Sequence, residues 1–241
     1  MPSTVPATAV VTPTRHPWAA VYRLAVAGAA AGAVTADMLI GPPSRVLSDW
    51  AIQSAIALTV ILALSARRAW TAQHPVPTAL TGAVMLYATI TALVHHALLA
   101  SASPPPSITG MPGTHPLWQS TAGHLLHTAL PAAVLLDWLL LTPPGRLHLR
   151  QAASWMLFPL AYLAFFLTRG ELLPSGARDR YLYPFLDVTR HGYKHVLANA
   201  LLLGLAFYAL ALVFVALDHT RPNPVRHRRT TTGFRLRPPV G

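Results

Sequence analysis

Six long apolar stretches most constrain what this chain can fold into. They cover residues 18–40, 48–66, 79–100, 121–141, 151–168 and 193–217. A helix needs about 20 mainly apolar residues to cross the ~30 Å hydrocarbon layer of a bilayer, and each stretch is close to that length. Because backbone polar groups find no water in hydrocarbon, each stretch is expected to be helical. We predict an all-α, polytopic integral membrane protein, a bundle of six transmembrane helices.

Composition supports this class. Of the 241 residues, 53% are hydrophobic and 10% are charged, whereas soluble domains carry about 25% charged residues. The remaining parts are a flexible Pro- and Thr-rich tail over 1–17 and a basic tail over 218–241. The first residues lack the pattern of a removable signal peptide. The chain has no cysteine, which excludes disulfides, thiol catalysis and thiolate metal sites.

The distribution of charge predicts the orientation. An even number of spans places both termini on one side of the membrane. Most of the 18 Lys and Arg lie in the two tails and in the loops 67–78 and 142–150, which the positive-inside rule assigns to the cytoplasm. We predict a multi-pass protein of the cell (inner) membrane with cytoplasmic termini, whose basic tail contacts anionic lipid rather than nucleic acid. The six tryptophans lie near predicted span ends, as in an interfacial aromatic belt.

Polar side chains from several spans fall at the predicted extracytoplasmic ends. Ionisable residues inside a membrane are functional candidates by default. His124, His127 and Thr128 share one helical face, and we expect His96, His124 and His127 to face the bundle interior. The set is Asp37, Ser48, Asp49, His95, His96, His124, His127, Thr128, Arg169, Tyr183, Asp187 and Asn199. The plainer interpretation is that the histidines bond to neighbouring backbone at helix ends.

Several kinds of chemistry remain open for this set. A histidine beside a hydroxyl can activate that hydroxyl for attack on an ester carbonyl. The candidate hydroxyls are Ser48, Ser54 and Thr128, and the sequence has no Gly-x-Ser-x-Gly motif. Four histidines on neighbouring spans could instead ligate a metal or haem. A protein that binds or transports lipid without catalysis is the other alternative.

Two motifs resemble a known family. His124-x-x-His127-Thr128-x-x-Pro131, and Tyr183-Pro-Phe-Leu-Asp187 before the last span, look like the androgen-induced-gene and androgen-dependent TFPI-regulating proteins, and more closely their bacterial six-span ("Pr-six-Pr") relatives. The resemblance covers about residues 21–218. It implies a membrane hydrolase of fatty acid esters of hydroxy fatty acids with a threonine nucleophile and a histidine. The histidine falls on His127; the threonine position holds Val46, or Ser48 after a shift of two residues.

We therefore predict a hydrolase of lipid esters with His127 as base and Ser48 as nucleophile. The expected partners are membrane lipid and a lipid-ester substrate, with no cofactor, metal or nucleic acid, and no pattern sets the oligomeric state. The supporting pocket residues are expected to be His124, Thr128, His96, Asp49, Arg169, Tyr183, Asp187 and Asn199.

Overall fold

The structure, a computed structural model, describes residues 15–99, 117–177 and 180–222. All regular secondary structure in these ranges is helical, and six helices are long and apolar enough to cross a membrane, as predicted. Among the described residues, four spans are interrupted: the third and fourth by π-helical turns, the fifth by a break and the sixth by a kink at Gly192. In chain order the elements are α1 (Pro17–Ile40), α2 (Pro43–Val46), α3 (Trp50–Trp70), α4 (Thr78–Val94), η1 (His95–Leu99), α5 (Leu117–His124), η2 (Leu125–Ala129), α6 (Leu130–Leu136), η3 (Asp137–Leu141), α7 (Leu149–Trp155), α8 (Leu157–Leu172), η4 (Pro184–Leu186) and α9 (Val188–Thr220).

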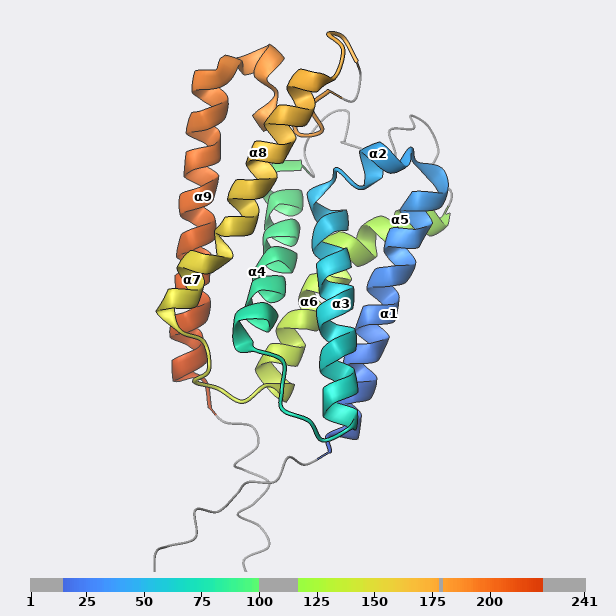
Figure 1. The fold of residues 1–241 in the computed structure, drawn as a ribbon, viewed down its shortest axis with the longest axis vertical. Helices are drawn as coiled ribbons and strands as arrows, with labels where there is room; N and C mark the ends of the chain where they lie inside the picture. Colours follow the sequence, from blue (N-terminus) through green and yellow to red (C-terminus); the bar gives the residue numbers. More distant parts are fainter. Residues whose placement is uncertain (1–14, 100–116, 178–179, 223–241) are drawn as a thin grey trace, which may run out of the picture.

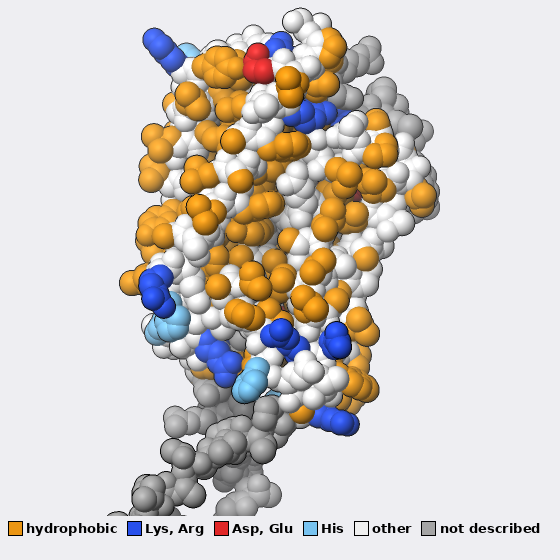
Figure 2. All heavy atoms as spheres, viewed as in Figure 1, with side chains coloured by type: hydrophobic (Ala, Val, Ile, Leu, Met, Phe, Trp, Pro, Cys, Tyr) orange, Lys and Arg blue, Asp and Glu red, His pale blue; other side chains and the backbone are white. Residues whose placement is uncertain are grey.

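The helices stand side by side in one bundle, with both ends of the described chain at the same end of it (Figure 1). We call this end the terminal end and the opposite one the distal end. Apolar side chains dominate the face shown in Figure 2, and basic side chains gather toward its two ends. Leu201, Leu202 and Leu205 of α9 are among the exposed leucines. This is the surface expected of helices in contact with acyl chains.

Small residues set the contact between α1 and α3. Ala27, Ala30 and Ala33 of α1 are each no more than 3% exposed. Alanines let two helix backbones approach closely, which is how helices without a hydrophobic driving force associate in membranes. α3 begins at Asp49, whose Oδ1 accepts the backbone N–H of Ala51 at 2.7 Å, so one free donor at this helix start is satisfied.

Pro131 explains the irregular fourth span. Proline has no N–H to donate and its ring crowds the carbonyl four residues earlier, that of His127. The chain responds with a π-helical turn, in which the N–H of Leu130 bonds the carbonyl of Leu125 through an i→i+5 pattern. The turn occupies the positions of His127 and Thr128, so the break re-aims these two side chains.

Pro159 breaks the fifth span near the junction of α7 and α8. It cannot donate to the carbonyl of Trp155, which in hydrocarbon would be a costly unpaired acceptor. The hydroxyl of Tyr87 in α4 replaces the missing donor, because it donates to Trp155 O at 2.9 Å. A proline in one span is thus matched by a tyrosine in another, and the pair fixes α4 against the α7–α8 junction.

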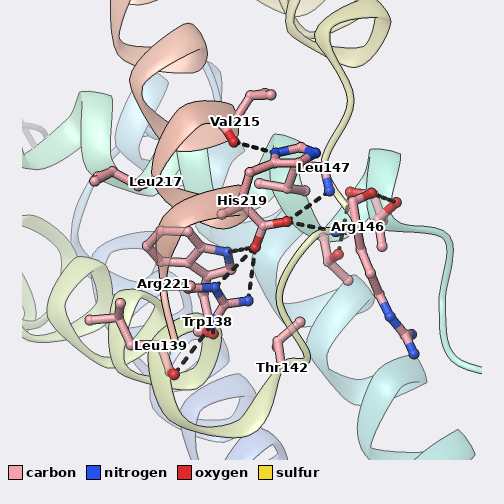
Figure 3. A network of polar contacts seen from close by, with 12 residues as sticks. Trp138, Leu139, Thr142, Arg146, Leu147, Val215, Leu217, His219 and Arg221 are labelled. Carbon is pink, nitrogen blue, oxygen red and sulfur yellow. Dashed lines mark hydrogen bonds and ion pairs between the residues drawn. The ribbon is translucent and has the colours of Figure 1, made fainter. Parts of the chain in front are cut away.

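A buried cluster ties the end of α9 to the terminal end (Figure 3). Asp218, 1% exposed, accepts the N–H groups of Arg146 at 2.7 Å and Leu147 at 2.9 Å through Oδ2. Its Oδ1 accepts Trp138 Nε1 at 3.1 Å and the guanidinium of Arg221 at 2.9 Å. Arg221 also donates to the carbonyl of Trp138 and lies over that indole ring, 4.6 Å from its centroid. We call Trp138, Arg146, Leu147, Asp218 and Arg221 the terminal clamp.

The tryptophans depart from the predicted interfacial belt. Trp18 and Trp70 are exposed, but Trp50, Trp138 and Trp155 are no more than 8% exposed. Trp118 has no described side chain. Indole is amphipathic, so at a span end it can face lipid or turn inward when a partner is close. Trp155 Nε1 has such a partner in Ala79 O at 2.7 Å, and Trp138 has Asp218.

Candidate functional site

A cavity of about 150 Å³ lies in the distal half of the bundle. It extends from the distal end toward the middle of α9. Its polar wall is formed by Asp49, Thr91, His95, His127, Tyr162 and Tyr183. Its apolar wall includes Val94, Leu160, Leu163, Leu203 and Phe207. An apolar hollow with a few convergent polar groups is the usual form of a small-molecule site.

Asp49 and Tyr183 form the innermost polar contact of the cavity. The Tyr183 hydroxyl donates to Asp49 Oδ2 at 3.1 Å and accepts the backbone N–H of Trp50 at 3.1 Å. Burial raises the pKa of the Asp49 carboxyl, against the lowering effect of its bonds from Ala51 and Tyr183. Burial also raises the pKa of the Tyr183 hydroxyl well above 10.0, with the Asp49 charge as the second cause. The sequence placed both residues in the pocket, and both line it.

Ser48 lies next to this contact, but its hydroxyl is directed elsewhere. Ser48 Oγ donates to the carbonyl of Ser44 at 2.5 Å, and its own carbonyl accepts the Tyr162 hydroxyl at 2.9 Å. Ser48 is 4% exposed and is not among the described residues that line the cavity. Its assignment as nucleophile therefore stays a prediction, and its hydrogen bond favours a structural part at the α2–α3 corner.

His127 and His95 form a stacked pair at the cavity wall. Their ring centroids are 4.0 Å apart, with 27° between the planes. His127 Nδ1 lies 2.9 Å from the carbonyl of Gly123, and because a carbonyl only accepts, Nδ1 carries a proton. In the neutral ring Nε2 then holds the lone pair. His127 therefore presents a fixed tautomer with one nitrogen able to accept a proton.

His96 and Thr128 meet on a different side of the same two helical turns. His96 Nε2 lies 3.1 Å from Thr128 Oγ1, and both side chains are exposed. The expectation that His96, His124 and His127 all face the interior is wrong for His96 and His124, which are exposed, whereas His127 is half-buried. His95 and His96 are neighbours in sequence and cannot both point inward. The π-helical turn after His124 also rotates His127 away from the face that an α-helix would give both residues.

The other predicted pocket residues hold the distal end together without lining the cavity. Asp187 begins α9, its Oδ1 accepting the N–H of Thr189 at 2.9 Å. Asn199 donates its amide to the carbonyl of Phe185 at 2.9 Å. Arg169 is half-buried in the last turn of α8. These residues shape the loop that carries Tyr183 over the cavity.

Trp50 and Tyr162 are cavity residues that the sequence did not identify, and His95 was included only in the wider polar set and not among the expected pocket residues. Trp50 looked like part of an interfacial belt, Tyr162 like one aromatic among several in an apolar span, and His95 was indistinguishable from His96. The indole Nε1 of Trp50 is buried and has no hydrogen-bond partner among the described residues. A tyrosine within an otherwise aliphatic run is the signal that could have pointed to Tyr162, because buried hydroxyls need partners.

Comparisons with models of known protein families, with curated proteins and with solved structures find no match for this chain. Within residues 15–99, 117–177 and 180–222, no group of three or more His, Cys, Asp or Glu is arranged to hold a metal ion. His95 instead contacts two other histidine rings, stacking on His127 at 4.0 Å and meeting His96 edge-on at 5.1 Å between centroids, and His96 reaches Thr128. Chemically, the cavity offers a proton acceptor at His127 beside room for an apolar molecule.

Proposed function

We propose that this membrane protein hydrolyses a lipid ester held in the distal cavity, with His127 as the general base. The observation that carries the proposal is the fixed tautomer of His127 at the wall of an apolar cavity. A base must present a lone pair where the attacking oxygen sits, and the Gly123 carbonyl orients the ring for this. The motifs at residues 124–131 and 183–187 resemble motifs of membrane hydrolases of fatty acid esters, and this resemblance also supports the proposal.

The reaction needs one proton to move twice. Nε2 of His127 takes a proton from the attacking oxygen as that oxygen bonds to the ester carbonyl carbon. The tetrahedral intermediate then collapses, the carbon–oxygen bond to the alcohol breaks, and the protonated ring returns the proton to the departing alkoxide. With water as the attacking group, acid and alcohol form directly; with a hydroxyl, an acyl-enzyme forms first and water releases it.

The geometry favours water over the described hydroxyls in the cavity scheme. Ser48 donates to Ser44, and Thr91, which lines the cavity, donates to the carbonyl of Tyr87 at 2.9 Å. Thr128 is within hydrogen-bond reach of a histidine, but that histidine is His96. A Thr128–His96 pair is thus a second arrangement for the same reaction, one that places the ester outside the cavity wall.

Hydrolysis of a fluorogenic long-chain ester by the purified protein tests the proposal. His127→Ala should reduce the rate by roughly 10²- to 10⁴-fold, the usual contribution of a general base. His219→Ala is the matched control, since His219 Nδ1 makes the same bond to the carbonyl four residues earlier, at 2.8 Å, but at the terminal end. An equal rate for His127→Ala and the parent protein would reject His127 as the base.

Two further variants separate the arrangements. Thr128→Val and His96→Ala should leave the rate unchanged if His127 activates water, and both should abolish it if Thr128 is the nucleophile. Ser48→Ala should keep the rate in either case. A fluorophosphonate probe, which labels hydroxyl nucleophiles, should label Thr128 in the second arrangement and no hydroxyl in the first.

Lipid binding without hydrolysis is the second candidate function. It is favoured by Asp49, the carboxylate of the cavity wall, which accepts the Ala51 N–H and the Tyr183 hydroxyl, whereas the group that orients His127 is the carbonyl of Gly123. Saturable lipid binding with no ester hydrolysis in the parent protein would establish this function instead.

The orientation belongs to the same proposal: the terminal end faces the cytoplasm and the cavity the opposite side of the cell membrane. The basic residues Arg67, Arg68, Arg146 and Arg150 near the terminal end support this under the positive-inside rule. Ser175→Cys, a single cysteine in a cysteine-free chain, should react with an impermeant maleimide in intact cells. Labelling of His74→Cys instead would reverse the orientation.

A further inference from the structure

The middle of α9 is only partly covered by the rest of the bundle. From Leu197 to Leu210 no residue is buried, whereas Val196 and Ala211 on either side of this stretch are 0% exposed. α9 is therefore packed at both ends, through the distal loop and through the terminal clamp, and loosely held between them. The cavity lies under this loose stretch, since Ala200, Leu203, Gly204 and Phe207 all line it.

On the neighbouring helix, α8, the cavity wall reaches the surface of the molecule. Leu160 lines the cavity and is also 61% exposed. Pro159 and Leu163 beside it line the cavity and are half-buried. A residue that borders an internal space and the outer surface marks an edge of an opening. In a membrane-spanning bundle this surface is in contact with hydrocarbon, not water.

Gly204 is the narrowest side chain along this edge. A Cβ added there would meet no atom within 4 Å, although Gly204 lines the cavity and is half-buried. The space beside Gly204 is therefore open. A close approach of two helices does not explain this glycine, in contrast to Gly82, whose Cβ would lie 2.4 Å from Trp155.

We propose that a single acyl chain enters the cavity sideways from the bilayer, through a portal formed by Leu160 and Leu163 of α8 and Leu203, Gly204 and Phe207 of α9. The occupant is the acyl chain of the lipid ester, so this inference rests on the proposed function. The experiment below measures fatty-acid binding and not hydrolysis. The tail lies along Gly204 and Phe207 near the middle of the spans. The polar end lies at His127, Asp49 and Tyr183.

The gradient of polarity along the cavity selects this occupant. The wall is apolar along α9 and at Leu160 and Leu163 of α8, where the hydroxyl at this depth, that of Tyr162, is taken up by the carbonyl of Ser48; Asp49, His95, His127 and Tyr183 lie toward the distal end. A wholly apolar guest would leave the polar wall unused, and a water-soluble guest would have to cross hydrocarbon to reach the portal. Trp50 adds a donor, because its buried Nε1 has no partner among the described residues and its ring lines the cavity. A buried N–H without a partner is costly, and a carbonyl oxygen of the guest would satisfy it.

Photo-cross-linking tests the portal. The full-length protein in phosphatidylcholine nanodiscs is irradiated with a diazirine-bearing palmitic acid, the acid product of such an ester, with and without excess oleic acid. Labelling that oleic acid displaces reports the cavity, and labelling that it leaves reports the surrounding bilayer. We expect displaceable labels on Leu163, Leu203 and Phe207.

Gly204→Trp should fill the portal and reduce displaceable labelling at least tenfold. Gly32→Trp on α1 is the matched control, since its added Cβ also meets no atom within 4 Å and Gly32 does not line the cavity. Gly204→Leu, a smaller change, should give an intermediate loss and replaces Gly204→Trp if that variant does not purify as a folded protein. Displaceable labelling that is absent in the parent protein, or unchanged by both Gly204 variants, overturns the portal. Normal labelling without ester hydrolysis would reject the proposed hydrolysis and leave the portal standing.

Discussion

Two buried aspartates at opposite ends of the bundle are surrounded very differently. Asp218 of the terminal clamp accepts two backbone N–H groups, an indole N–H and a guanidinium. Asp49 at the distal end accepts the backbone N–H of Ala51 and the hydroxyl of Tyr183, and a cavity lies beside it. The tryptophans repeat the contrast, since Trp138 Nε1 is bonded and Trp50 Nε1 is not.

The difference extends to every unpaired buried atom in the described chain. The side-chain atoms without a hydrogen-bond partner there are Asp37 Oδ2, Trp50 Nε1 and Ser54 Oγ, and all three lie in the distal half. Buried polar groups are nearly always satisfied, so unsatisfied ones need a reason. A completed network rigidifies a structure, whereas one with open positions can receive a ligand. This contrast supports the proposal that the distal end binds a ligand, whereas the completed network of the terminal clamp stabilises the fold.

The largest expected effect is the loss of the terminal clamp. Asp218→Ala removes the counter-charge of the Arg221 guanidinium and leaves the N–H groups of Arg146 and Leu147 without their acceptor, in a site where Asp218 is 1% exposed. Removing one partner of a buried ion pair costs ~3–5 kcal/mol. The free energy of unfolding of the detergent-solubilised protein should therefore fall by this amount. Arg190→Ala is the control, because Arg190 pairs with Asp187 while its own side chain is 72% exposed, and such pairs contribute ~1 kcal/mol or less. Equal losses in the two variants would remove the contrast between the ends.

A smaller effect separates the two tryptophans. Trp138→Phe removes a bond to a charged acceptor, whereas Trp50→Phe removes an N–H that has no partner. Both lose similar ring volume, so the difference between them reports the hydrogen bond, worth ~1.5–3 kcal/mol when the partner is charged, together with the weaker contact of a phenyl ring with Arg221. We expect Trp138→Phe to be less stable by that amount, and Trp50→Phe to lose displaceable fatty-acid labelling instead. Chemical denaturation and fatty-acid labelling of both variants test this. A larger loss of stability in Trp50→Phe, or a loss of labelling in Trp138→Phe alone, would contradict the roles given to the two tryptophans.

The smallest effect is a pH dependence at the distal end. Burial raises the pKa of Asp49 in the folded protein above its unfolded value, so folding favours the protonated carboxyl. The resulting stability is complete below the unfolded pKa of about 4 and is lost as pH rises through the folded pKa. Relative to Asp49→Asn, which cannot titrate, the parent protein should therefore lose melting temperature as pH increases from 4 to 8. Parallel curves for the two proteins would show that Asp49 titrates as it does in the unfolded chain.

Some of the site could be predicted because position along a span sets depth in a membrane. Asp49, His127 and Tyr183 lie at predicted distal ends of three segments, and all three line the cavity. The direction in which a side chain points around the helix axis was harder to predict from the sequence. His96 and His124 were expected to face inward on α-helical spacing, but the turns at 95–99 and 125–129 are π-helical. Pro131 was visible in the sequence, yet a proline can be accommodated by a kink, a break or a wider turn, so it did not fix the rotation.

The sequence by itself determined the all-helical class and the six long apolar helices of the described residues, because lipid leaves backbone polar groups no partner outside a helix. Only the tertiary structure decided which polar groups are satisfied. The carbonyl of Trp155 is bonded by a tyrosine of another span, and Asp218 by groups from three separate segments. These contacts join residues many positions apart, and side-chain direction at each of them depends on packing between helices. The same packing leaves Trp50 Nε1 without a partner among the described residues and the middle of α9 only partly covered, and local sequence contains no information about either.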